Sequence, residues 1–128
     1  LAAARGMERQ VIHCGPTGDV AEYHAAADVF VLPTQYEAFC LAILEALGSG
    51  LPVVTSSVPG ARDAIVPGVN GNTIKDPNSG MELAEVLRPY LDAGFRAEVS
   101  ARAPETVESY QWPKVLERYE RVLEENAR

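Results

Sequence analysis

Two glutamates eight positions apart, Glu37 and Glu45, are the residues of this sequence best placed to do chemistry. They lie in an otherwise apolar segment that follows a strand-like run, residues 29–33. A carboxylate in apolar surroundings is costly to bury without a partner or an opening to solvent. Eight helical residues rise about 12 Å, and steps of about 100° place the two side chains on neighbouring faces. This spacing predicts that one carboxylate meets each end of an elongated polar ligand lying along the helix start.

The alternative interpretation is that both glutamates are solvated surface groups, since Glu is rarely buried. The position of Glu37 favours a ligand, because α/β proteins bind ligands outside the carboxyl ends of their strands. The peptide N–H groups at the start of the following helix are expected to be unpaired, and the helix dipole favours an anion there. A phosphate group fits this description. The residues concerned are Ala38, Phe39, Cys40 and Leu41.

The segment 37–54 resembles the signature of retaining GT-B glycosyltransferases of the group-one type, glycosyltransferase family four. In that family the first glutamate of an E-x7-E motif lies near the donor sugar. The second holds the ribose hydroxyls of the nucleotide, and the amides between them face the diphosphate. The resemblance implies that Glu37 is the catalytic, sugar-proximal residue and that Glu45 binds the ribose. The other implied substrate-binding residues are Ala38, Phe39, Cys40, Leu41, Gly15 and Pro16. Further matching stretches are residues 11–15, 19–28, 57–60, 63–66 and 68–71.

Two departures from the family pattern affect the phosphate site. Ala38 and Cys40 replace the usual glycines, and their Cβ atoms limit how closely a diphosphate approaches the backbone. Some lipopolysaccharide-core glucosyltransferases tolerate Glu-Ala at this point, so the change is compatible with a subfamily. Some of those relatives also carry an arginine near the donor after the glycine matching Gly15, whereas this chain has Pro16. Phosphate neutralisation must then come from elsewhere.

The resemblance implies that residues 1–128 are part of a donor-binding domain, with an acceptor-binding Rossmann domain preceding it in the intact protein. The intact protein would be a hexosyltransferase that moves a sugar from a nucleoside diphosphate sugar to an acceptor hydroxyl with retention of configuration. Uridine diphosphate donors are commonest among relatives, and guanosine and adenosine diphosphates are the alternatives. The fragment alone is expected to be inactive. Glu37 would position a sugar hydroxyl or support the cationic sugar, and it is not assigned as a nucleophile.

Composition excludes several other classes. A chain that is 47% hydrophobic and 23% charged has the balance of a globular domain. Its net charge of −7 argues against nucleic-acid binding, which needs a basic face. No run approaches the roughly 18 apolar residues of a membrane span. We therefore expect a cytoplasmic protein, which a lipid-linked or lipopolysaccharide acceptor would bring to the inner membrane face as a peripheral protein.

The cysteines and histidines do not predict a metal site. Cys14 and Cys40 lie in apolar surroundings and have neither CxxC spacing nor a disulfide framework. Both are therefore predicted to be reduced thiols in the core. His13 and His24 have no acidic or thiol partners at metal-ligand spacing, so structural roles are favoured for both. No Asp-x-Asp motif occurs. We expect neither a metal nor a cofactor.

Strands alternate with helices over residues 8–76, which predicts a Rossmann-like parallel sheet with flanking helices. Residues 78–127 are predicted to be entirely helical, and the apolar stripes on these helices are predicted to be packing surfaces. Pro89 and Pro104 are expected to bend or end helices, and Pro113 to begin the last one. The predicted strands are 11–14, 29–32, 52–55 and 72–74, and the predicted helices of the alternating part are 19–27, 38–48 and 60–66.

One conflict arises from this pattern. In the doubly wound strand order 3-2-1-4-5-6, the strand at 11–14 is third and is separated from the strand at 29–32 by two absent strands. Three explanations would resolve this conflict. Another chain supplies the missing strands through self-association, the strand at 11–14 pairs with a different strand, or the folded protein contains more residues than this sequence.

Two alternative functions are weighed against transfer. A nucleotide-sugar epimerase of GT-B fold also holds a nucleotide at a helix start, and acceptor-independent epimerisation would distinguish it. A non-catalytic α/β binding module of the receiver type would need an acidic pocket at the ends of its first strands and a lysine after a later one. No such set is apparent in the sequence.

Overall fold

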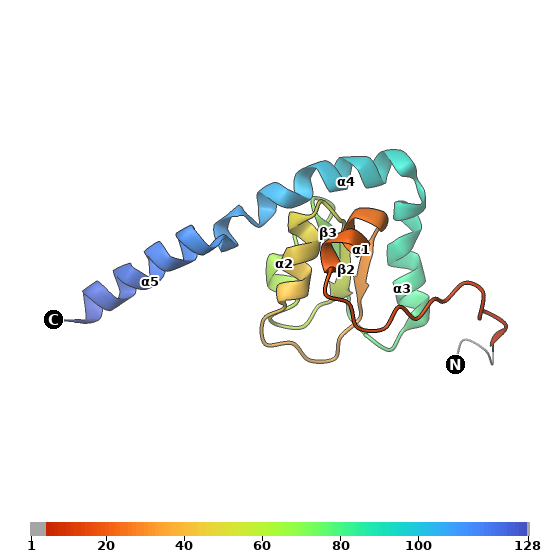
Figure 1. The fold of residues 1–128 in the computed structure, drawn as a ribbon. Coiled ribbons are helices and arrows are strands. Elements are labelled where there is room, and N and C mark those ends of the chain that lie inside the picture. The colour runs from red at the N-terminus through yellow and green to blue at the C-terminus, as the bar shows by residue number, and fades with distance from the viewer. Residues whose placement is uncertain (1–4, 128) are drawn as a thin grey trace.

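The computed structural model describes residues 5–127 as a parallel sheet with helices packed around it and a helical carboxy-terminal segment (Figure 1). The predicted fold class is confirmed. The elements in chain order are α1 (Val20–Ala26), β1 (Phe30–Leu32), α2 (Leu41–Gly48), β2 (Val53–Ser56), η2 (Arg62–Ala64), β3 (Gly71–Ile74), α3 (Gly80–Leu87), η3 (Arg88–Leu91), α4 (Ala93–Thr106), η4 (Glu108–Tyr110) and α5 (Trp112–Asn126), the η elements being 3₁₀ turns.

The sheet has three parallel strands in the order β1-β2-β3. Phe30 and Gly71 both lie opposite Val53, and every residue of β2 is buried. Because a central parallel strand is covered on both faces, burial does not alternate along β2, and its polar residues Thr55 and Ser56 are buried together with Val53 and Val54. Gly71 is required at its position, since a Cβ there would collide with the carbonyl group of Val53.

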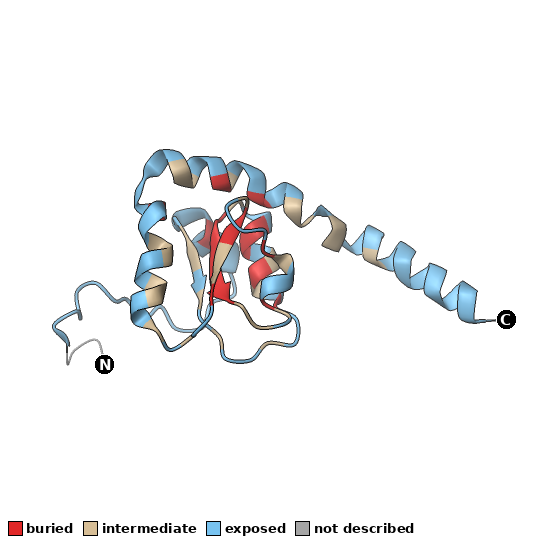
Figure 2. Ribbon diagram, turned by 180° about the vertical axis from the view of Figure 1, so that it is seen from behind, coloured by how far each residue is buried: buried red, intermediate tan, exposed pale blue. Residues whose placement is uncertain are grey.

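Two apolar clusters cover the two faces of the sheet. Val53 packs with Ile43, Ala46 and Leu47 of α2, and with Ala103 of α4. Val54 faces the other way, toward the cluster of Ile74, Tyr90 and Val99. Figure 2 shows the buried residues gathered on the sheet and on the inward faces of α2 and α4. The first cluster fixes α2, which carries the candidate site, against the sheet.

The strand predicted at residues 11–14 is wrong. Within the described residues this segment pairs with no strand, and Ile12 is 82% exposed. The observed order β1-β2-β3 corresponds to the last three strands of the doubly wound order, in which residues 11–14 would not neighbour β1. The segment has no strand to pair with and stays irregular. Cys14 is exposed for the same reason, so its prediction as a core thiol is also wrong, whereas Cys40 is buried.

The prolines act differently in the three carboxy-terminal helices. α3 ends at Leu87 and a 3₁₀ turn carries Pro89, and Pro113 lies in the first turn of α5, both as predicted. Pro104 does not end a helix, because α4 continues through it to Thr106. Val99 and Ala103 are buried on α4. Their packing outweighs the loss of one backbone hydrogen bond for the last turn.

The last helix extends away from the sheet (Figure 1), and its apolar face is not a packing surface within residues 5–127. The exposed apolar residues on it are Trp112, Leu116, Tyr119, Val122 and Leu123. On α3, Leu83, Val86 and Leu87 do pack against the second cluster, as predicted. None of the helices described between residues 5 and 127 has the length and apolar character needed to span a membrane.

Replacing Asn70 by alanine is expected to lower the free energy of unfolding by about 2 kcal/mol, since buried hydrogen-bond partners are left unpaired. Asn70 is fully buried. It accepts from the Val66 N–H (2.8 Å) and donates to the Ala64 carbonyl (2.8 Å) and to Thr106 Oγ1 (2.7 Å), which ties the loop before β3 to α4. Urea unfolding measures the change. The exposed Asn126→Ala is the control, and equal effects of the two would contradict this account.

Candidate functional site

The turn between β1 and α2 carries Glu37 at the carboxyl end of the sheet. Thr34 shapes the turn by donating from its hydroxyl to the Tyr36 carbonyl (2.8 Å). Gln35 donates to Asn78 Oδ1 (2.9 Å) and links the turn to the loop before α3. Glu37 is half-buried, whereas Tyr36 is 83% exposed. The first glutamate therefore lies where the sequence predicts, at the mouth of a strand–loop–helix turn.

The N-terminus of α2 begins later than predicted. Cys40 is its N-cap residue, and the Cys40 N–H donates to the Gly60 carbonyl (3.2 Å). The prediction that the amide of Cys40 is unpaired is therefore wrong, because the loop after β2 supplies an acceptor. The first-turn amides belong to Leu41, Ala42 and Ile43. Since Cys40 makes no side-chain capping hydrogen bond and no acidic residue lies in this first turn, the positive end of the dipole is left to attract an anion.

The Cys40 thiol lies beside Glu37 and under the first turn of α2. Burial raises the pKa of this thiol, the nearby amides of Ile43 and Ala42 lower it, and the Glu37 carboxylate raises it again. Burial and the neighbouring carboxylate therefore favour the protonated thiol. Glu37 thus lies close to the helix start that the sequence predicts as a phosphate site.

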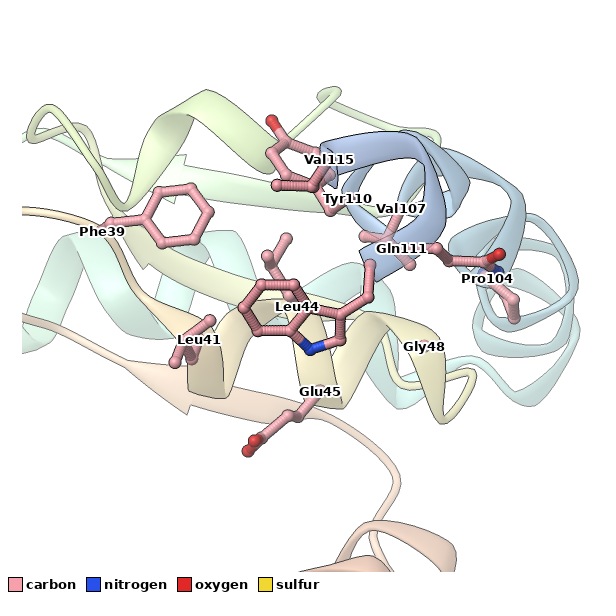
Figure 3. A pocket seen from close by; sticks show the side chains of 11 residues that line it. Phe39, Leu41, Leu44, Glu45, Gly48, Pro104, Val107, Tyr110, Gln111 and Val115 are labelled. Atoms are coloured by element: carbon pink, nitrogen blue, oxygen red, sulfur yellow. The ribbon is translucent and has the colours of Figure 1, made fainter. Parts of the chain in front are cut away.

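Glu45 is exposed on α2 and borders two cavities. One, of about 350 Å³, lies between α1 and α2 and is lined by Gly18, Val20, Ala21, His24, Glu45 and Ser49. The other, of about 560 Å³, is mostly apolar and lies between α2 and the segment from α4 to α5, with Leu44, Val107 and Tyr110 in its wall. Figure 3 shows the Glu45 carboxylate pointing out of this second cavity. The cavity beside α1 is the one where Glu45 would meet a polar ligand.

The remaining predicted site residues are distributed over three places. Phe39 and Leu41 are largely exposed and line the apolar cavity, and Ala38 is exposed in the turn. Gly15 and Pro16 lie in the exposed segment before α1. Glu37 lines neither of the cavities that Glu45 borders. The structure thus gathers Glu37 to Leu41 at one helix start and leaves Glu45 about one turn along the same helix.

His24 and Ser49 are site neighbours that the sequence did not single out for ligand binding. His24 is buried, with its ring edge-on to Phe30 and its Nδ1 3.3 Å from Ser49 Oγ. Ser49 in turn donates to the Glu45 carbonyl (2.8 Å). His24 therefore joins α1 to α2, which is the structural role predicted for it, while His13 is exposed. Among residues 5–127, no cluster of three His, Cys, Asp or Glu side chains is arranged to hold a metal ion.

Comparison with known proteins identifies the family to which this arrangement belongs. The family model described as glycosyl transferases group 1 matches residues 1–106. This chain belongs to that family. It is 39% identical over 109 residues to a sucrose synthase of Denitrovibrio acetiphilus, covering 80% of this chain and 14% of that protein. It is 38% identical over 91 residues to a lipopolysaccharide glucosyltransferase of Escherichia coli, covering 71% of this chain and 24% of that one.

Solved structures agree on the fold of this group 1 glycosyl transferase chain. The Anabaena protein HepE, solved in complex with UDP, superimposes with a TM-score of 0.89 at 24% identity over 97% of this chain and 35% of its own. A sucrose-phosphate synthase of Thermosynechococcus elongatus gives 0.88 at 24% identity, over 97% and 32%. The fold is therefore that of GT-B glycosyltransferases. The chain spans less than a third of the length of the curated relatives named above.

Proposed function

We propose that this chain is the donor-binding part of a glycosyltransferase that moves a hexose from a nucleoside diphosphate sugar to an acceptor hydroxyl with retention of configuration. The observation that carries the proposal is the placement of the two glutamates. Glu37 lies in the turn that follows β1, and Glu45 lies on the helix that this turn begins. The rest of the enzyme, including the acceptor site, is assigned to a domain outside this chain.

We assign the diphosphate to the first turn of α2. The amides of Leu41, Ala42 and Ile43 and the helix dipole would stabilise the negative charge that develops on the departing nucleotide. The helix is already fixed, because Ile43 and Leu47 are buried against the sheet. Donors held in place before the reaction need no reorganisation when charge develops, which makes them effective. In this proposal catalysis needs no metal ion.

We assign the nucleotide ribose to Glu45 and the donor sugar to Glu37. The carboxylate of Glu45 borders the cavity between α1 and α2, where ribose hydroxyls would donate to it. Glu37 is placed before the helix, on the sugar side of the diphosphate, to accept from a sugar hydroxyl or to stabilise a cationic sugar in the transition state. Glu37 and Glu45 would thus bind the sugar end and the ribose end of one elongated ligand.

Uridine diphosphate glucose is the first donor to test. The Anabaena HepE structures contain UDP and UDP-glucose, and one curated relative is named a lipopolysaccharide glucosyltransferase. A lipopolysaccharide or other glycolipid acceptor would bring the intact protein to the membrane surface as a peripheral protein. A ligand-detected NMR screen of uridine, guanosine and adenosine diphosphate sugars against the full-length protein tests the proposal. Binding of none of these sugars would refute it, and acceptor-independent epimerisation would replace it with an epimerase.

Replacing Glu45 by alanine in the full-length protein is expected to weaken UDP binding about tenfold or more, because lost hydrogen bonds to a charged group contribute about 1.5–3 kcal/mol. Isothermal titration with UDP measures the change. Glu85→Ala is the matched control, since Glu85 is an exposed glutamate on α3. Unchanged UDP affinity in Glu45→Ala would contradict the ribose assignment.

A further inference from the structure

Gly60, in the loop after β2, packs its backbone directly against the turn that carries Glu37. Its φ is +77°, which side-chain-bearing residues rarely adopt. A Cβ at Gly60 would lie 2.6 Å from the Glu37 carbonyl oxygen and nearer still to that of Ala38. Both obstacles are backbone atoms, so no side-chain rotation relieves the clash. A glycine is therefore needed here for the loop and the turn to lie as close as they do.

Two hydrogen bonds hold Gly60 in this position. Its carbonyl accepts from the Cys40 N–H (3.2 Å), and its N–H donates to Asp63 Oδ2 (3.1 Å). Asp63 lies in η2, whose flanking residues Ala61 and Ile65 are buried in the same cluster as Cys40. The 3₁₀ turn is thus anchored in the core, and Asp63 is itself exposed. A chain of contacts runs from Asp63 through Gly60 to Cys40.

The same contacts determine where the Glu37 side chain lies. Glu37 is half-buried three residues before Cys40, and its carboxylate is close enough to the Cys40 thiol to raise the pKa of that thiol. The thiol belongs to Cys40, which donates its N–H to the Gly60 carbonyl, and the backbone of Glu37 itself lies against Gly60. Moving Gly60 would move the carboxylate with the turn.

We propose that Asp63 and Gly60 are positioning residues that clamp the turn 37–40 against the start of α2, so that Glu37 meets the sugar end of the donor. This inference rests on the proposed function for what Glu37 contacts. It separates the two ends of the site: the clamp acts on the turn, whereas the burial of Ile43 and Leu47 in the core holds α2 and its Glu45. Loss of the clamp is then expected to affect recognition of the sugar and not of the nucleotide.

The experiment compares four variants of the full-length protein by isothermal titration with UDP and with UDP-glucose. Asp63→Ala removes the acceptor for the Gly60 N–H, whereas Asp63→Asn keeps an oxygen there. Arg62→Ala is the matched control, because Arg62 and Asp63 form an exposed ion pair (3.7 Å) that all three of these variants lose. Gly60→Ala adds the clashing Cβ. Hydrogen exchange of the Cys40 amide reports on the clamp itself in every variant.

Asp63→Ala is expected to raise Cys40 amide exchange and the Kd for UDP-glucose about tenfold, with the Kd for UDP within about twofold of wild type, because a displaced turn loses sugar contacts. Asp63→Asn and Arg62→Ala are expected to have the wild-type Cys40 amide exchange and Kd values. Gly60→Ala is expected to raise the exchange and the Kd for UDP-glucose at least as much as Asp63→Ala does. Equal weakening of both ligands, or no change in Asp63→Ala, would overturn the positioning role while the proposed function stands. Wild-type protein that binds neither ligand would refute the proposed function and this inference together.

Discussion

Sugar transfer by the full-length protein is expected to fall about 100- to 1,000-fold when Glu37 is replaced by glutamine, the loss seen when one preorganised electrostatic group is removed from an active site. The substitution keeps the size of the side chain, removes its charge and replaces one accepting oxygen by an NH2 donor. UDP affinity is expected to stay within about twofold, because Glu37 is assigned to the sugar and not to the nucleotide. Release of UDP from the donor in the presence of an acceptor measures the rate.

The control for Glu37→Gln is Glu22→Gln, which removes a charge from an exposed glutamate on α1. It is expected to leave the rate unchanged. A Glu37→Gln enzyme with a rate close to wild type would show that the Glu37 charge takes no part in transfer, and the catalytic assignment would then be abandoned. Loss of rate together with an equal loss of UDP affinity would move Glu37 to the nucleotide.

Leu47→Ala is expected to lower the free energy of unfolding by about 3–4 kcal/mol, in the range measured for buried leucines that leave a cavity. Leu47 is fully buried in the cluster that joins α2 to the sheet. The loss would therefore loosen the helix that carries both the first-turn amides and Glu45. Urea unfolding followed by circular dichroism measures the change.

Leu41→Ala is the control for Leu47→Ala, because Leu41 is the first residue of the same helix and is 62% exposed. It is expected to change the free energy of unfolding by less than about 0.5 kcal/mol, as surface substitutions do. Comparable losses in the two variants would mean that α2 is not held by the cluster described here.

The sequence was most informative where apolar pattern and turn chemistry agreed. The sequence predicted a strand at 52–55, and β2 (Val53–Ser56) lies there with every position buried. Gly50 has a φ of +82° just beyond α2, the left-handed conformation in which glycine commonly ends a helix. The same agreement placed Glu37 in the turn after β1. Local rules succeed at these positions because each element finds its partners within the chain.

The errors arose where a distant segment decides the local structure. Residues 11–14 have the apolar character of a strand, yet strand formation needs a neighbouring strand, and none of those described lies beside them. The amide of Cys40 is paired because Gly60, twenty residues later, supplies a carbonyl. Neither propensity nor spacing encodes such contacts.

A crystal structure of the full-length protein with UDP tests the central claim most directly, since it locates the nucleotide relative to α2. We predict phosphate oxygens at about 3 Å from the N–H groups of Leu41, Ala42 or Ile43, and ribose hydroxyls at a similar distance from the Glu45 carboxylate. A nucleotide bound elsewhere, for instance in the apolar cavity between α2 and α5, with no contact to these amides or to Glu45, would contradict the account.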